Sequence, residues 1–130
     1  MAKLTPQQAS DLASNFLGLA QAVGDFRFNN WNNLSKAENQ KLGSLQWSIL
    51  NYGEDILAQS TSLVMNDVQD SLARISDVTQ QIKGTIDQLQ KVQKAINVAA
   101  SIVTLGGAIV STNPQAIADG IKGVIEAWKA

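Results

Sequence analysis

The segment INVAASIVTLGGAIVSTNPQAIADGI, residues 96–121, decides how the rest of the chain can fold. Between residues 98 and 110 its only polar side chains are two hydroxyls, so a helix here is apolar on all sides. Asn113 and Pro114 then start a new helix, because asparagine accepts a backbone N–H at a cap and proline suits the first helical position. The segment therefore predicts a helical hairpin whose first arm is apolar.

Regular apolar spacing leads into this hairpin from the N-terminal side. Nine residues recur at close to the heptad spacing of about 3.5, which keeps one stripe of a helix facing a partner. This seam consists of Val68, Leu72, Ile75, Val78, Ile82, Ile86, Leu89, Val92 and Ile96. Because the pattern enters the apolar arm without interruption, it predicts one long helix over residues 62–110. Such a helix would be ~70 Å long, so either it breaks, with Gly106-Gly107 as the candidate position, or the protein is elongated or oligomeric.

Two capping signals predict the helices of the N-terminal half. Thr5-Pro6-Gln7-Gln8 has the form of a capping box, and the apolar stripe after it predicts a helix over 6–23 with Gly24 as its C-cap. Ser35-Lys36-Ala37-Glu38 is a second box, which predicts a helix over 36–60. The asparagine-rich stretch between these helices is predicted to be an irregular connection pinned by aromatic side chains.

No segment alternates between apolar and polar residues at sheet length. The chain of 130 residues is long enough for one core, so we expect a single domain over residues 1–130. The expected fold class is all-α: an elongated bundle of three to five helices, with a long heptad-bearing helix and a C-terminal helical hairpin. The last helix of that hairpin is predicted over 114–128.

Composition excludes several classes of function. Ten basic and eleven acidic residues give a net charge of -1, which predicts no nucleic-acid partner. Histidine and cysteine are both missing from the sequence, so the usual bases, nucleophiles and zinc ligands are missing too. The best candidates for a catalytic carboxylate pair or a magnesium site are Glu54-Asp55 and Asp67 with Asp70. Their spacing is typical of solvated helix faces. We expect a non-enzymatic protein with no catalytic, cofactor-binding or metal-binding residues.

The N-terminus bears on localisation. MAKLTPQQAS lacks the apolar run of a cleaved signal peptide. We therefore expect a protein that is cytoplasmic or exported without a cleaved leader.

The aromatic residues Phe26, Phe28 and Trp31 allow two interpretations. Buried rings would anchor the connection on the core. Exposed rings beside Arg27 would form a patch for a protein partner, since aromatic residues and arginine dominate binding hot spots. The sequence leaves both open.

The apolar arm also allows two interpretations. A spanning helix needs about 20 apolar residues, and a run as short as 98–110 is more often a buried core helix. Small residues in the arm would nevertheless permit close helix contacts in lipid, and three lysines, Lys83, Lys91 and Lys94, precede it. If the hairpin inserts, the membrane-contacting residues are Val98, Ile102, Val103, Leu105, Gly106, Gly107, Ile109 and Val110.

A seam-bearing helix that runs into AASIVTLGGAIVSTNPQAI resembles the coiled coil and hydrophobic head of α-helical pore-forming toxins of the cytolysin A and tripartite enterotoxin type. The resemblance covers residues 82–128. It implies a soluble helical bundle that exposes an apolar hairpin on membrane contact and oligomerises. On this basis we expect membrane association through the hairpin. The alternative is a soluble interaction, adaptor or immunity-type protein whose seam pairs with itself or with a helical partner.

Overall fold

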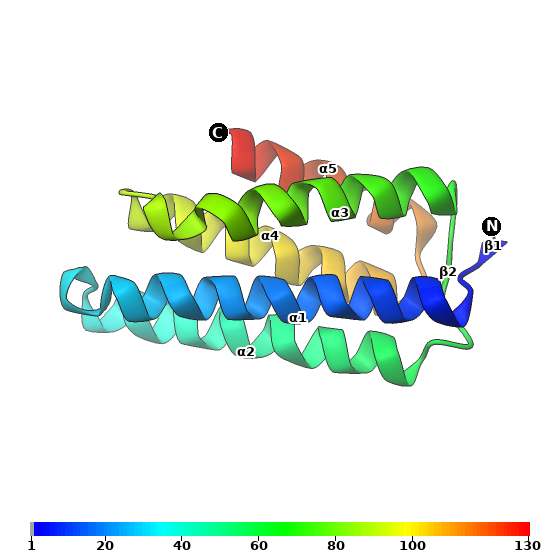
Figure 1. Cartoon of the computed structure of the whole chain (residues 1–130), viewed down its shortest axis with the longest axis horizontal. Helices are drawn as coiled ribbons and strands as arrows, with labels where there is room; N and C mark the ends of the chain where they lie inside the picture. Colours follow the sequence, from blue (N-terminus) through cyan, green and yellow to red (C-terminus); the bar gives the residue numbers. More distant parts are fainter. Residues whose placement is uncertain (1) are drawn as a thin grey trace.

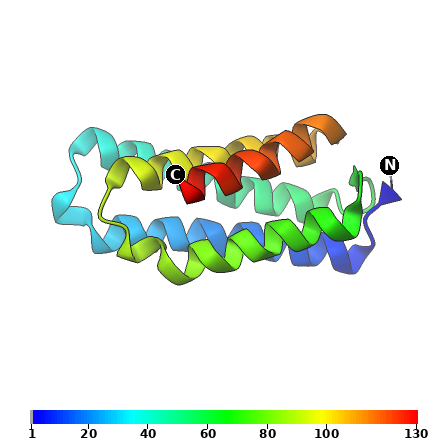
Figure 2. The same cartoon turned by 90° about the horizontal axis from the view of Figure 1, so that it is seen from above.

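Five α-helices pack side by side in the computed structural model, which describes residues 2–130 (Figure 1). Their bounds are Pro6–Asn29 (α1), Lys36–Ala58 (α2), Val68–Thr85 (α3), Val92–Val110 (α4) and Pro114–Lys129 (α5). The most extensive contacts follow a closed ring in the order α1, α2, α4, α5, α3 and back to α1, so the apolar faces meet at its centre. α1, α3 and α5 run in one direction, and α2 and α4 run in the other (Figure 1 and Figure 2). The predicted all-α bundle is confirmed.

Three helices begin at the caps that the sequence predicts. The Gln8 backbone N–H donates to Thr5 Oγ1 at 3.0 Å, and the Thr5 N–H donates to the Gln8 side chain at 2.9 Å. Ser35 and Glu38 form the same reciprocal pair at the start of α2. Asn113 caps α5 by accepting the N–H three residues further on at 3.1 Å. These bonds satisfy N–H groups that the start of a helix otherwise leaves unpaired.

The first helix is longer than predicted. It continues through Gly24 to Asn29, so the predicted end at residue 23 is wrong. Gly24 is not a cap but a point of close approach, because a Cβ there would collide with the side-chain amide of Gln46 on α2. Continuing the helix places Phe26 on the buried face of α1. Only residues 30–35, which include a 3-10 turn, connect α1 to α2.

The predicted helix over residues 62–110 is wrong as a single element. It divides into α3 and α4, which are separated by the 3-10 turn η2 (Ile86–Gln88) and by extended backbone at Leu89 and Lys91. An unbroken helix would be roughly twice as long as α1, and its apolar second half would project from the bundle. Because the chain turns back, that half packs against α2 and α5.

The seam residues therefore do not form one continuous coiled-coil stripe. Most lie on α3 or in the connection after it, whereas the last two lie on α4. Ile75, Val78, Ile82, Ile86 and Ile96 are buried, and Val68, Leu72, Leu89 and Val92 are half-buried against the same core. The period continues across the break because both helices bury an apolar stripe in the same bundle.

Two short strands, β1 (Ala2–Lys3) and β2 (Val64–Met65), pair antiparallel where the sequence predicts no strand. Next to this pair, the Leu4 N–H donates to the Leu63 carbonyl at 3.0 Å. Strands of two residues are too short to show an alternating pattern. We call this end of the bundle the sheet end; it also holds the starts of α1, α3 and α5 and the ends of α2 and α4 (Figure 1).

α4 and α5 form the predicted C-terminal hairpin, with a tight turn between them. The Thr112 N–H donates to the Ile109 carbonyl at 3.1 Å, and the Asn113 N–H donates to the Ala108 carbonyl at 3.4 Å. This pair of bonds is the Schellman arrangement, whose left-handed position usually holds glycine. Here Thr112 holds it, with φ at 53°. The turn is therefore short and conformationally strained.

The glycine pair of α4 does not mark a break. α4 runs through Gly106 and Gly107 to its end at Val110, so the break predicted there is wrong. The two glycines instead let the ring of Tyr52 on α2 lie directly against α4.

Candidate functional site

Exposed aromatic side chains lie at the end of the bundle opposite the sheet, which we call the aromatic end. Phe28, in the last turn of α1, is 79% exposed, and Trp31, in the turn that follows, is 53% exposed. Phe26, the third residue of the predicted patch, is 1% exposed and belongs to the core. The patch therefore contains two of the three predicted aromatic residues. Together with Arg27, which directly precedes Phe28 in the sequence, these residues form a surface that we call the aromatic surface: Arg27, Phe28 and Trp31.

Arg27 holds this surface in place. Its Nε donates a hydrogen bond to Asn39 Oδ1 on α2, and its Cζ lies 5.3 Å from the centroid of the Trp31 ring. That distance allows a cation–π interaction. Gly43 of α2 leaves room for the guanidinium, because a Cβ there would lie 2.9 Å from Arg27 Cζ. Neighbouring residues thus position Arg27 and Trp31, whereas Phe28 stays in solvent.

A groove of about 280 Å³ opens beside these rings, between α1 and α2. Its walls combine the aromatic surface with the carboxylate of Asp25 and the side-chain amides of Gln21 and Gln46. Pockets for small molecules usually measure ~300–1,000 Å³ and enclose most of the ligand. This smaller, open groove is better suited to one or two side chains of a partner protein.

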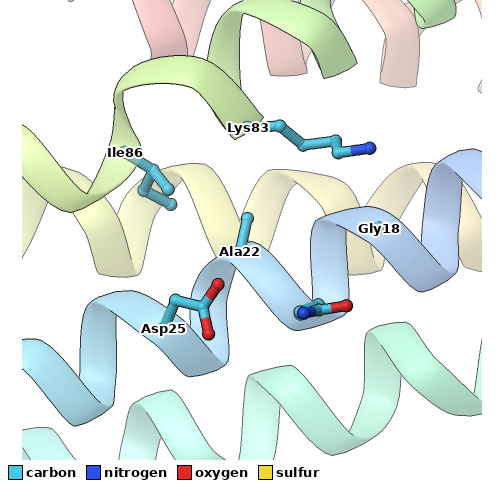
Figure 3. A pocket seen from close by; sticks show the side chains of 6 residues that line it. Gly18, Ala22, Asp25, Lys83 and Ile86 are labelled. Carbon is cyan, nitrogen blue, oxygen red and sulfur yellow. The ribbon is translucent and has the colours of Figure 1, made fainter.

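A second groove of about 340 Å³ lies beside the first, between α1 and α3 (Figure 3). Lys83 extends from α3 to Gly18 of α1, where a Cβ would lie 3.1 Å from the lysine Nζ. The Asp25 carboxylate lies apart from this ammonium group in Figure 3, and no ion pair joins the two. Gln21 and Asp25 line both grooves, so the grooves flank one ridge of α1.

The predicted membrane element is packed into the bundle. Val98, Ile102, Leu105, Gly106 and Ile109 are buried, and Val103, Gly107 and Val110 are half-buried. Within residues 2–130, α4 is the one helix that is long and apolar enough to cross a membrane. The buried core helix of a soluble protein meets the same criterion, so length and composition are weak evidence for a span.

Two further apolar residues are exposed that were not predicted from the sequence to form a surface. Trp47 is 64% exposed and Leu57 is 53% exposed, both on α2. The signal for Trp47 was present: the apolar stripe of α2 passes through Leu45 and Ile49, and Trp47 falls midway between them on a different face. Leu57 follows the stripe residue Ile56 directly, so it too lies off the buried face.

Across residues 2–130, no group of three or more acidic residues is arranged to hold a metal ion. In comparisons with known proteins, no family model, no curated protein and no solved structure matches this chain. The aromatic surface and the charges around it are therefore the features of the molecule that indicate a function.

Proposed function

We propose that this protein is a non-enzymatic helical binding module whose aromatic surface docks on another protein. The observation that carries the proposal is the 79% exposure of Phe28, on a helix whose opposite face already fills the core. Burying such a ring in an interface is worth about 1.5–3 kcal/mol. Trp31 and Arg27 add the two residue types most common at interaction hot spots.

The charges around this surface indicate the chemistry of the partner. Lys36 and Lys41, on the first turns of α2, are exposed near Arg27, whose guanidinium contacts Asn39 between them in sequence. A partner that presents an apolar side chain among carboxylates would match both the rings and the positive charge.

The aromatic surface is tested by replacing Phe28 and Trp31 together with alanine. We expect capture of the partner from an extract of the producing cells to weaken at least tenfold, because tenfold corresponds to only about 1.4 kcal/mol. The free energy of unfolding should change by less than about 1 kcal/mol, since both side chains are exposed. Quantitative mass spectrometry of the captured proteins measures the loss. The matched control is Leu17→Ala, which truncates an exposed apolar residue of α1 away from this surface. Equal capture by all three proteins would contradict the proposal.

A second candidate function is membrane association through the α4–α5 hairpin, and one feature of α4 favours it. From Ala95 to Val110 the helix carries no charged residue, even at its exposed positions Asn97 and Thr104. A surface helix of a bundle normally carries charges on its outer face. The resemblance to pore-forming toxins belongs to this candidate.

Flotation with liposomes tests this second candidate. If the hairpin inserts, the protein should float with phosphatidylcholine vesicles, and Val103→Asp should reduce the bound fraction at least tenfold, because a carboxylate at the centre of a bilayer costs about 2.5–3.5 kcal/mol. Val103 is only half-buried in the bundle, which makes it a better position for the test than a fully buried residue. If the protein floats at none of the lipid concentrations, hairpin insertion is excluded.

A further inference from the structure

Charged residues are distributed unequally between the two ends of the bundle. Within about two helical turns of the sheet end, the acidic residues outnumber the basic residues Lys3 and Arg74. These acidic residues, all exposed, are Asp11, Glu54, Asp55, Asp67, Asp70 and Asp119. The corresponding segments of the aromatic end contain more basic than acidic residues. The acidic residues there are Asp25, Glu38 and Asp87. The basic residues there are Arg27, Lys36, Lys41, Lys83, Lys91 and Lys94. A nearly neutral chain thus folds into a molecule with an acidic end and a basic end.

Helix dipoles explain only part of this separation. Acidic residues stabilise the start of a helix and basic residues its end, as Asp70 and Lys83 do in α3. α2 runs in the opposite direction, yet Lys36 and Lys41 lie near its start, and Glu54 and Asp55 lie near its end. Its last turn contains no basic residue. Apart from Glu38 in the first turn, the charges near the two ends of α2 therefore follow the end of the molecule and oppose the helix dipole.

Each end also carries exposed apolar side chains among its charges. At the sheet end, Leu57 is 53% exposed in the last turn of α2, next to Glu54 and Asp55 in sequence. At the aromatic end, Phe28 and Trp31 are exposed beside the basic residues. The two ends are thus complementary in charge, and both offer apolar surface for a contact.

We infer that the aromatic end binds the sheet end of a second copy of this chain. This inference rests on the proposed function, for which it names the partner. The rings of Phe28 and Trp31 would cover Leu57, while Lys36 and Lys41 would face Glu54 and Asp55 of the next copy. Because the two contacting surfaces differ, the association leaves one of each free and continues head to tail. Exposed charges are screened by salt, so the association weakens as ionic strength rises.

Two charge-reversal variants test this arrangement by sedimentation velocity. Glu54→Lys with Asp55→Lys makes the charged α2 positions beside Leu57 basic, like Lys36 and Lys41 at the other end. Lys36→Glu with Lys41→Glu makes these α2 positions acidic at both ends. All four side chains are exposed, and every change brings α2 into better agreement with its helix dipole, so both variants should fold. The mass of the wild-type protein should rise above 13.9 kDa with concentration at low salt. Each variant alone should need at least tenfold more protein to associate, and an equimolar mixture should regain association.

The mixture gives the decisive result. Restored association supports head-to-tail binding through the complementary ends. The inference is overturned if the mixture stays monomeric, if either variant alone associates like the wild type, or if the wild type is monomeric at every salt concentration. Flotation on phosphatidylglycerol vesicles that depends on Lys36 and Lys41, without self-association, would also overturn it in favour of a lipid surface. Capture of a different protein that depends on Phe28 and Trp31 would leave the proposed function standing while this inference fails.

Discussion

Ile102→Asp is expected to leave the protein unfolded in plain buffer. Ile102 lies in the middle of α4 with no exposed surface. Shortening a buried isoleucine costs about 2–5 kcal/mol, and the buried, unpaired carboxylate adds several kcal/mol more. The sum is comparable to the whole stability of a typical domain, about 5–15 kcal/mol. Far-ultraviolet circular dichroism should show loss of most helical signal, and thermal melting should show no cooperative transition.

The neighbouring residue provides the control for this experiment. Val103 is half-buried, so an aspartate there can turn its carboxylate towards water. We expect Val103→Asp to lose only about 1–3 kcal/mol and to keep a helical spectrum with a lower melting temperature. A folded, normally melting Ile102→Asp protein would show that α4 is not the core helix of the bundle in solution.

The starts of α1, α2 and α5 could be predicted from the sequence because their causes are local. Thr5 and Gln8 lie three residues apart, as do Ser35 and Glu38. Within each pair, each side chain accepts the backbone N–H of the other residue, without help from the rest of the chain. The cap at Asn113 is equally local. Where the residues that cap a helix lie within one turn of each other, the sequence alone was enough to predict where the helix begins.

The break between α3 and α4 could not be predicted because its cause is tertiary. The backbone turns after Thr85, but neither proline nor glycine occupies the connection from Ile86 to Lys91. Gly84 lies inside α3, with no neighbouring atom close to where its Cβ would be. The chain turns here because the apolar residues of α4 are buried by α2 and α5, and periodicity does not contain that information.

The aromatic surface could be predicted in part. Extending the stripe of α1 from Phe16 and Val23 by three residues reaches Phe26, so helical spacing alone would have assigned that ring to the core and left Phe28 outside. The separation of charge between the two ends could not be predicted. It depends on the directions of five helices, which only the folded topology defines.

Gly106→Ala is expected to destabilise the protein by about 2 kcal/mol, although alanine is the better helix former by about 1 kcal/mol. A Cβ at Gly106 would lie 2.7 Å from Cδ2, 2.8 Å from Cγ and 2.9 Å from Cβ of Tyr52. These atoms include the root of the tyrosine side chain, so α2 and α4 would have to move apart to relieve the collision. Differential scanning calorimetry should show a melting temperature lower by roughly 8 °C.

The adjacent glycine should respond with the opposite sign. A Cβ at Gly107 would lie 3.4 Å from the Tyr52 hydroxyl, which is an ordinary contact, so Gly107→Ala should gain about 0.5–1 kcal/mol from helix propensity. Combining Gly106→Ala with Tyr52→Ala should recover part of the loss, because alanine removes the colliding ring atoms Cγ and Cδ2 and leaves only the contact with Cβ. The coupling in this double-mutant cycle should exceed about 1 kcal/mol. Equal effects at both glycines, or no coupling to Tyr52, would mean that α2 and α4 do not meet at Gly106. The close packing of Tyr52 on α4 would then not help to bury this apolar helix.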